Sequence, residues 1–222
     1  MGGVAMAAAI DALERATSKP LLWATIQFLN HGFLGDEIDI NVEPVGGGRN
    51  VTQMMASLSK GNMVLQRVFG ALGERPNGKG DVFVSMPEVP APDDCPAKAD
   101  DTFGRPDNLL AQFERRTAVE DNDSGYECMW MRPLFDAQVS APLLALMSDF
   151  FLGAHPATRG GTSLDNTLRV HATAPTEWVL CVTQFAGFVR GAVHGSQHMF
   201  THDGVLLTSS SQTGLLPNRP KA

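Results

Sequence analysis

The chain has 222 residues, more than one small domain needs and well short of two large ones, so we expect one or two compact domains. Hydrophobic residues make up 43% and charged residues 18%, a composition that can form a core and is not that of a disordered chain. The formal net charge is −7 and no stretch clusters lysine and arginine, which argues against nucleic acid as the main partner.

The cysteines and the apolar segments indicate in which cellular compartment the protein is expected. Cys95, Cys128 and Cys181 lie far apart and are odd in number, so they predict neither a disulfide framework nor a paired-cysteine metal site. No apolar run approaches the ~18 residues needed to cross a bilayer, and the Ala-rich beginning of the chain has no basic region before it. We therefore expect a cytoplasmic protein that does not contact a membrane.

The first third of the chain predicts one helix followed by strands. Apolar residues recur at helical spacing over residues 4–16, with Asp11, Glu14 and Arg15 on the other side. Segments of strand length then alternate with Gly-rich or polar turns, and the last two form a hairpin. These predicted strands are 21–29, 37–45, 50–59 and 63–72.

The composition changes over residues 74–107, where six prolines stand among several aspartates. Proline removes a backbone donor, so this segment predicts neither a helix nor a central strand but an extended linker that crosses the surface of a domain. Beyond it, the residue patterns predict a helix over 141–153, with Pro142 in its first turn. The predicted strands around that helix are 109–120, 126–133, 163–171, 178–185, 188–200 and 204–215.

Laid side by side, the two halves repeat one order of helix, strand, strand and long hairpin. A helix followed by a run of antiparallel strands, made twice, predicts an α+β fold in which each half wraps an antiparallel sheet around a central helix. We therefore divide the chain into an N-terminal unit over 1–73, the linker over 74–107 and a C-terminal unit over 108–222.

Several motifs of the second half resemble those of the bacterial acyl-CoA thioesterase II family, whose fold is a double hotdog. They match in order and spacing: Ser163-Leu164-Asp165-Asn166-Thr167, His171, Glu177-Trp178-Val179-Leu180, Asp203-Gly204 and Ser211-Gln212-Thr213-Gly214-Leu215. In the first half, Gly2-Gly3-Val4-Ala5-Met6-Ala7 resembles the opening of that family's first hotdog helix, and Gln27-Phe28-Leu29 and Gly48-Arg49 resemble later strands, more loosely. Family members carry one or two strands before that helix, so we expect residues upstream of Met1 or a partner that covers the gap.

The resemblance implies hydrolysis of an acyl-CoA thioester by a water molecule, without a covalent acyl-enzyme, metal or cofactor. It assigns the carboxylate role to Asp165 and the amide role to Gln212. A thioester is reactive enough for a water polarised by one aspartate, and an amide donor can orient that water and stabilise developing charge. The resemblance also implies an acyl-CoA partner and association into a homodimer or a higher homo-oligomer.

The third member of the family's site, a Ser or Thr hydroxyl, is not matched at the expected position. Ungapped alignment on Glu177-Trp178 places Ala186 there, and Thr183, three residues away, points to the opposite face of a regular strand. Three alternatives follow: another hydroxyl substitutes, the pair holds the water with lower activity, or the protein binds acyl-CoA without hydrolysing it.

Other chemistries fit the sequence less well. His194 and His198 lie in a predicted strand and His202 in the turn after it, and strand residues four apart are roughly 13 Å apart, too far to share a metal ion. No G-x-S-x-G sequence is present, which argues against a serine hydrolase. A hotdog hydratase would need an Asn-Pro and a His after its aspartate, and Asp165-Asn166-Thr167 lacks both.

Overall fold

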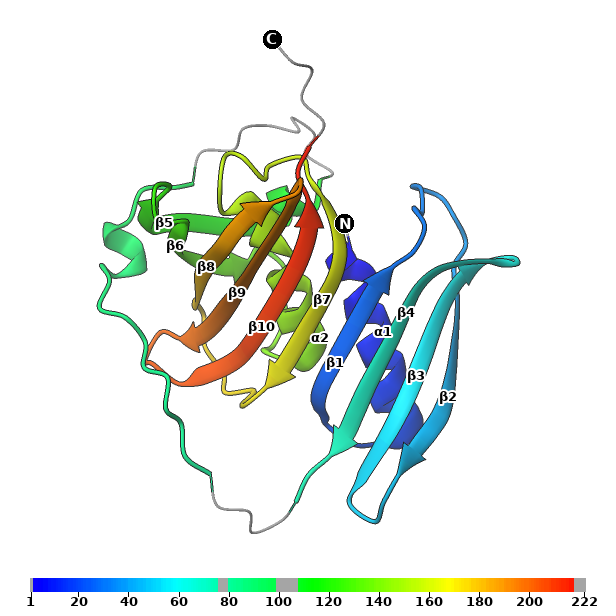
Figure 1. The fold of residues 1–222 in the computed structure, drawn as a ribbon. Helices are drawn as coiled ribbons and strands as arrows, with labels where there is room; N and C mark the ends of the chain where they lie inside the picture. The colour runs from blue at the N-terminus through cyan, green and yellow to red at the C-terminus, as the bar shows by residue number, and fades with distance from the viewer. Residues whose placement is uncertain (1, 76–79, 99–107, 218–222) are drawn as a thin grey trace.

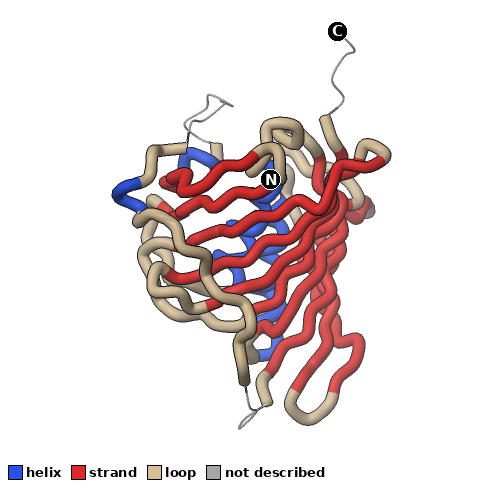
Figure 2. The backbone as a smooth tube through the Cα atoms, turned by 60° about the vertical axis from the view of Figure 1, so that its left-hand side comes forward, coloured by secondary structure: helices blue, strands red, loops and turns tan. Residues whose placement is uncertain are grey.

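The computed structural model describes residues 2–75, 80–98 and 108–217. Its strands form one ten-stranded sheet in the order β2-β3-β4-β1-β7-β10-β9-β8-β6-β5, with every neighbouring pair antiparallel. The sheet curves around the two α-helices, which both lie on its inner side (Figures 1 and 2). The expected α+β architecture of two tandem hotdog units is therefore confirmed.

The first unit wraps four strands around one helix. Met6, Ile10 and Leu13 recur on one side of that helix and are fully buried against the strands, which is why this Ala-rich segment is helical and internal. Its elements are α1 (Gly2–Thr17), β1 (Leu21–Phe28), β2 (Asp39–Gly47), β3 (Val51–Lys60) and β4 (Met63–Gly73).

The second unit wraps six strands around a shorter helix. Ser140 caps this helix, its hydroxyl accepting a bond from the Leu143 amide, and Pro142 occupies the first turn as expected. Its elements are η2 (Leu109–Gln112), β5 (Phe113–Asp121), β6 (Tyr126–Pro133), α2 (Ala141–Ser148), η3 (Asp149–Gly153), β7 (Thr162–Val170), β8 (Val179–Val189), β9 (Ala192–Thr201) and β10 (Leu206–Leu215).

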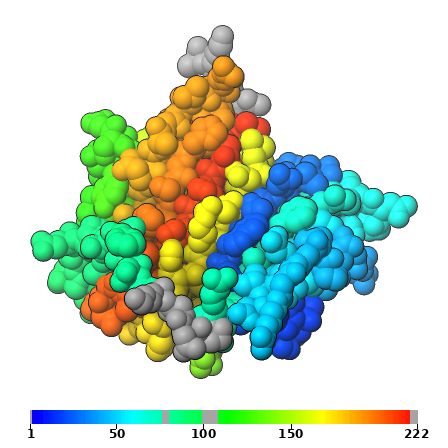
Figure 3. Space-filling model, turned by 60° about the horizontal axis from the view of Figure 1, so that its bottom comes forward, coloured from blue at the N-terminus to red at the C-terminus, as the bar shows by residue number. Residues whose placement is uncertain are grey.

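The two units join through one strand pair and through their helices. β1 and β7 pair antiparallel, and the hydroxyls of Thr25 and Thr167 lie 2.8 Å apart across the joint. Figure 3 shows β7 in yellow directly beside β1 in blue on the outer surface. On the inner side α1 contacts α2, where a Cβ on Gly3 would lie 2.8 Å from the Leu146 carbonyl oxygen. Glycine at this position therefore permits the close approach of the two helices.

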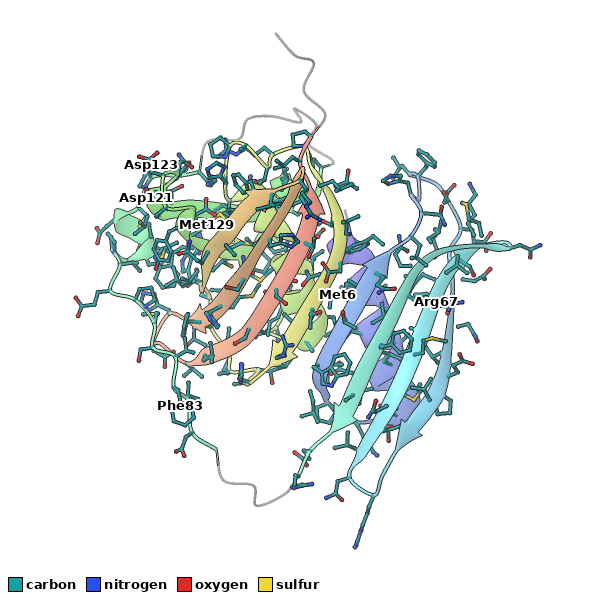
Figure 4. All side chains as sticks on the ribbon, viewed as in Figure 1. Met6, Arg67, Phe83, Asp121, Asp123 and Met129 are labelled. Carbon is teal, nitrogen blue, oxygen red and sulfur yellow. The ribbon has the colours of Figure 1, made fainter. Side chains whose placement is uncertain are left out.

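Residues 80–98, here called the strap, run extended along the second unit and include the short helix η1 (Pro92–Asp94). The strap covers the sheet face opposite α2, where the Trp130 indole donates to the Pro90 carbonyl (2.9 Å). It also pairs with β5 through the Ala97–Arg116 bridge. Phe83, by contrast, is 92% exposed and projects away from the sheets (Figure 4). The predicted extended path is observed over residues 80–98, and residues 76–79 and 99–107 of the predicted linker lie outside the described part.

Three predicted boundaries differ from the structure. Residues 109–112 and 149–153 are 3₁₀ turns rather than parts of a strand and an α-helix. The predicted break between 185 and 188 is a bulge within β8 at Gly187, and the chain reverses instead at Arg190-Gly191, both with positive φ. A glycine in a strand marks a bulge as readily as a turn, which explains this error.

Candidate active site

Three polar side chains from separate elements meet on the inner side of the sheet beside the end of α2. Asp149 begins η3, Ser163 lies in β7 and Gln212 lies in β10. The Gln212 amide donates to Asp149 Oδ1 (3.2 Å) and to Ser163 Oγ (2.7 Å), and the Ser163 hydroxyl donates to Asp149 Oδ1 (3.4 Å). The cluster thus joins a carboxylate, a hydroxyl and an amide by mutual hydrogen bonds.

The Asp149 carboxylate is buried and held from both sides. Its Oδ2 accepts a 2.7 Å hydrogen bond from the Gly3 amide at the beginning of α1, so the first unit contributes to this site in the second. Burial raises the pKa of Asp149, while the hydrogen bonds from Gly3, Gln212 and Ser163 oppose that rise. A carboxylate whose pKa is raised accepts a proton more readily than an exposed carboxylate does.

A β-bulge places Ser163 on the same face as Gln212. Gln212 lies opposite Asn166 in the β7–β10 pair, and Gly214, two residues further, lies opposite Ser163 because β7 carries one extra residue between them. Alternate residues of a strand share a face, so Gln212 and Gly214 point inward together with their partners. Without the bulge, Ser163 would point away from Asp149.

The structure does not bring Asp165 to Gln212. Asp165 lies opposite Thr213 rather than Gln212, and its Oδ1 accepts a 2.7 Å hydrogen bond from the Thr213 amide. Of the two predicted site residues, the cluster therefore contains Gln212, and its carboxylate comes from Asp149. Asp165 instead stabilises the β7–β10 bulge, because it satisfies a backbone donor where the ladder is interrupted.

The hydroxyl expected near position 186 comes from another part of the chain. Ala186 is exposed on β8, and Thr183 is buried with its hydroxyl accepting a bond from the Gln197 amide (3.0 Å). The hydroxyl that does contact Asp149 and Gln212 is that of Ser163.

A second set of polar groups supports the cluster from behind. The Asn166 amide donates to the Ser148 hydroxyl (2.8 Å), which donates to the Ala145 carbonyl (2.8 Å) in the last turn of α2. These bonds fix the residue before Asp149. The amide oxygens of Asn166 and Gln212 are buried and have no hydrogen-bond partner among the described residues. Such acceptors are the positions at which interior water binds.

The cluster opens on a cavity of about 1150 Å³ between the two units, lined by Asp149 and Ser163. Its walls come from α1, the segment from the end of β1 into β2, the ends of β3 and β4, and the segment from η3 to β7, with single residues from the strap, η2, β5, β6 and β10. This volume exceeds that of most small-ligand sites, and its lining is mainly apolar. The arrangement can therefore hold a long apolar ligand with one end beside the Asp149 carboxylate.

The sequence prediction named neither Asp149 nor Ser163 as a site residue. Asp149 follows the apolar run Leu143 to Met147, in a segment that was predicted to be one continuous helix. The signal that could have identified Asp149 as a candidate site residue was its position as a lone carboxylate in an apolar segment. Ser163 stood within the quoted motif, but only the bulge shows which way it points.

Comparisons with known proteins agree with this fold. One family model, described as acyl-CoA thioesterase C-terminal domain, matches residues 92–216, and a second, described as acyl-CoA thioesterase N-terminal domain, matches residues 1–73. No curated protein matches the chain. The C-terminal match begins within the strap, which the structure shows packed on the second unit.

Solved structures are similar over nearly the whole chain. A candidate thioesterase from Novosphingobium aromaticivorans DSM 12444 shares 29% identity at a TM-score of 0.90, over 98% of this chain and 87% of that one. Two mycobacterial proteins share the fold. The tesB protein of Mycobacterium avium subs paratuberculosis has 21% identity and a TM-score of 0.82, over 98% of this chain and 87% of that one. The acyl-CoA thioesterase II TesB2 of Mycobacterium marinum has 20% identity and a TM-score of 0.79, over 98% of this chain and 90% of that one. The chain belongs to the acyl-CoA thioesterase family and is a double-hotdog thioester hydrolase.

Proposed function

We propose that the protein hydrolyses acyl-CoA thioesters to the free acid and CoA by a water held at Asp149, Ser163 and Gln212. The observation that carries this proposal is the mutual hydrogen bonding of these three side chains, of which Asp149 and Ser163 line a large and mainly apolar cavity. Gln212 keeps the amide role predicted for it, and Asp149 takes the carboxylate role first assigned to Asp165.

Each group has a distinct task in this reaction. Asp149 accepts a proton from the water while the water oxygen attacks the thioester carbonyl carbon, and the C–S bond then breaks. The CoA thiolate leaves and takes up that proton, which returns Asp149 to its ionised form. Gln212 and Ser163 hold the carboxylate in place, and the unpaired Gln212 amide oxygen can accept a hydrogen bond from the same water. The N-terminus of α1, through Gly3, favours the ionised carboxylate.

Two isosteric substitutions test the assignment. Asp149→Asn keeps the shape but removes the proton acceptor, so it should lower kcat for thiol release about 100-fold or more. Asp165→Asn is the matched control, because Asp165 contacts a backbone amide of the sheet, and it should retain kcat within a few-fold. The reverse pattern would return the carboxylate role to Asp165.

Thiol release and thermal unfolding, measured together, separate hydrolysis from binding alone. If the wild type releases no thiol from short, medium, long or aromatic acyl-CoAs while one of them raises its melting temperature, the protein is a binder and not an enzyme. The complete cluster of Asp149, Ser163 and Gln212 favours hydrolysis.

We also propose that the protein is a cytoplasmic homodimer or higher homo-oligomer that acts on fatty acyl groups. Three buried free cysteines fit a reducing compartment. The outer edge of β2 is unpaired among the described residues, and such an edge favours association. No described helix has the length and apolarity to span a bilayer. A monomer in light scattering at micromolar concentration would contradict the oligomer.

A further inference from the structure

The cavity beside Asp149 has two chemically different sides. All the Asp, Glu, Lys and Arg side chains among its described lining residues, namely Lys98, Arg115, Asp149 and Arg159, belong to the strap or to the second unit. The side formed by residues 2–66 has none of them. An aliphatic chain gains most where it meets no charged group, so the two sides differ in what they can bind.

The side formed by the first unit has an apolar inner end and a rim on which large apolar side chains stand beside Asn30 and His31. Ala5 and Ala8 of α1 face the cavity with small side chains, opposite Ile38, Ile40 and Leu58. Small residues on one wall and branched aliphatic residues on the other leave space between the helix and the strands. This end can therefore admit a narrow, unbranched apolar group.

The rim is the loop between β1 and β2. Phe33 and Leu34 border the cavity, yet they are 74% and 99% exposed. The loop is held in shape, since the Phe33 amide donates to Asp36 (2.9 Å) and Asp36 pairs with Lys60 of β3 (2.5 Å). Large apolar side chains fixed in water at the edge of an apolar cavity mark a surface that a ligand covers.

We propose that the acyl chain of the substrate runs from Asp149 into the side of the cavity formed by the first unit, with Ala8 limiting its depth at the inner end and Phe33 contacting the chain at the rim. The thioester then lies at the junction of the units, and the CoA portion lies on the side that carries Lys98, Arg115 and Arg159. Lys98 is itself paired with Glu127, and Arg159 lies 3.8 Å from Glu120, so the orientation rests on the apolar side and not on unpaired cations. This inference rests on the proposed thioesterase function and adds which unit selects the acyl group.

The first test fills the inner end. In Ala8→Phe, the ratio of kcat/KM for hexadecanoyl-CoA to that for butyryl-CoA should fall by about tenfold or more. Burial of one methylene group changes kcat/KM about fourfold, and the new ring displaces at least two methylene groups of the long acyl chain. Ala7→Phe is the control, since Ala7 is also half-buried on α1 but does not line the cavity, and its ratio should match the wild type.

The second test changes the rim without touching the core. Phe33→Ser should raise KM for the longest chains about fourfold or more. Phe83→Ser, at another exposed phenylalanine on the strap, should leave KM unchanged. Both sites are exposed, so both variants should fold as the wild type does. This pair keeps the inference testable if Ala8→Phe fails to fold.

The outcomes separate the inference from the function. If the wild type releases thiol but neither Ala8→Phe nor Phe33→Ser changes the dependence on chain length, the acyl chain lies elsewhere and the inference is overturned while the function stands. If the wild type releases no thiol from any acyl-CoA, the proposed function fails and the inference fails with it.

Discussion

A buried carboxyl on β6 should make the stability of this protein depend on pH in the neutral range. Glu127 is 1% exposed on the inner face of the sheet, where it pairs with Lys98 of the strap. Burial raises the pKa of Glu127 from 4.5 to about 7, and Lys98 opposes that rise without cancelling it. The perturbation we consider is Glu127→Gln, which keeps the shape and removes the titration.

The sign and the size of this pH effect follow from the difference between the pKa of Glu127 in the folded state and in the unfolded state. Because the folded state prefers the protonated carboxyl, the stabilising contribution of Glu127 is complete below pH 4.5 and is lost as the pH rises through about 7. The difference between 4.5 and about 7 corresponds to about 3 kcal/mol, of which about 2.5 kcal/mol falls between pH 5 and pH 8. The wild type should therefore lose about 2–3 kcal/mol more unfolding free energy over this range than Glu127→Gln does.

Urea unfolding at pH 5, 6, 7 and 8 measures this difference directly. Glu177→Gln is the control, since Glu177 pairs with Arg132 at a site where its side chain is 70% exposed, and its pH dependence should match the wild type. Lys98 keeps Glu120 as a partner at 3.6 Å in the Glu127→Gln protein, which limits the cost of the substitution. Equal pH slopes for the wild type and Glu127→Gln would refute the reasoning.

Three further results are expected. Ser163→Ala should lower kcat for thiol release about tenfold or more, and Gln212→Ala should lower it about 100-fold, since each substitution leaves Asp149 with fewer hydrogen bonds. An unchanged kcat in steady-state kinetics would contradict the proposed site. Because burial raises the pKa of Asp149, kcat/KM should rise with pH through an apparent pKa above 3.8, and a pH profile flat down to pH 4 would exclude Asp149 as the base. Gly195→Ala should cost about 1–3 kcal/mol in urea unfolding, since its Cβ would lie 2.5 Å from a backbone oxygen and 2.7 Å from the Phe151 ring; wild-type stability would show that the ring yields.

The fold was predictable because local patterns decide it. The helical spacing of Met6, Ile10 and Leu13 predicted α1 almost to its ends, and alternating segments with Gly turns predicted most strands within two residues. The internal repeat then predicted that each sheet wraps a helix. Positions where one glycine allows two structures were not predictable, and Gly187 formed a bulge where a turn was expected.

The site was only partly predictable because its geometry depends on contacts between distant residues. The motif around Gln212 identified the strand that carries the amide, but the motif around Asp165 identified a strand and not the direction of its side chains. A bulge of one residue brings Ser163 to the inner face, and its position follows from the register between β7 and β10. Asp149 and Gln212 are 63 residues apart, and only packing of η3 against the sheet shows that they meet.

The hydrogen bond from Gly3 to Asp149 links residues 146 positions apart and has a consequence for biogenesis. Asp149 is oriented by α1, the first helix of the described chain, and it meets Gln212 on β10, the last strand of the sheet in chain order. The cluster of Asp149, Ser163 and Gln212 therefore cannot form before β10 has been made, however well the first unit has folded. If the proposed function holds, thiol release reports that both units have folded and joined.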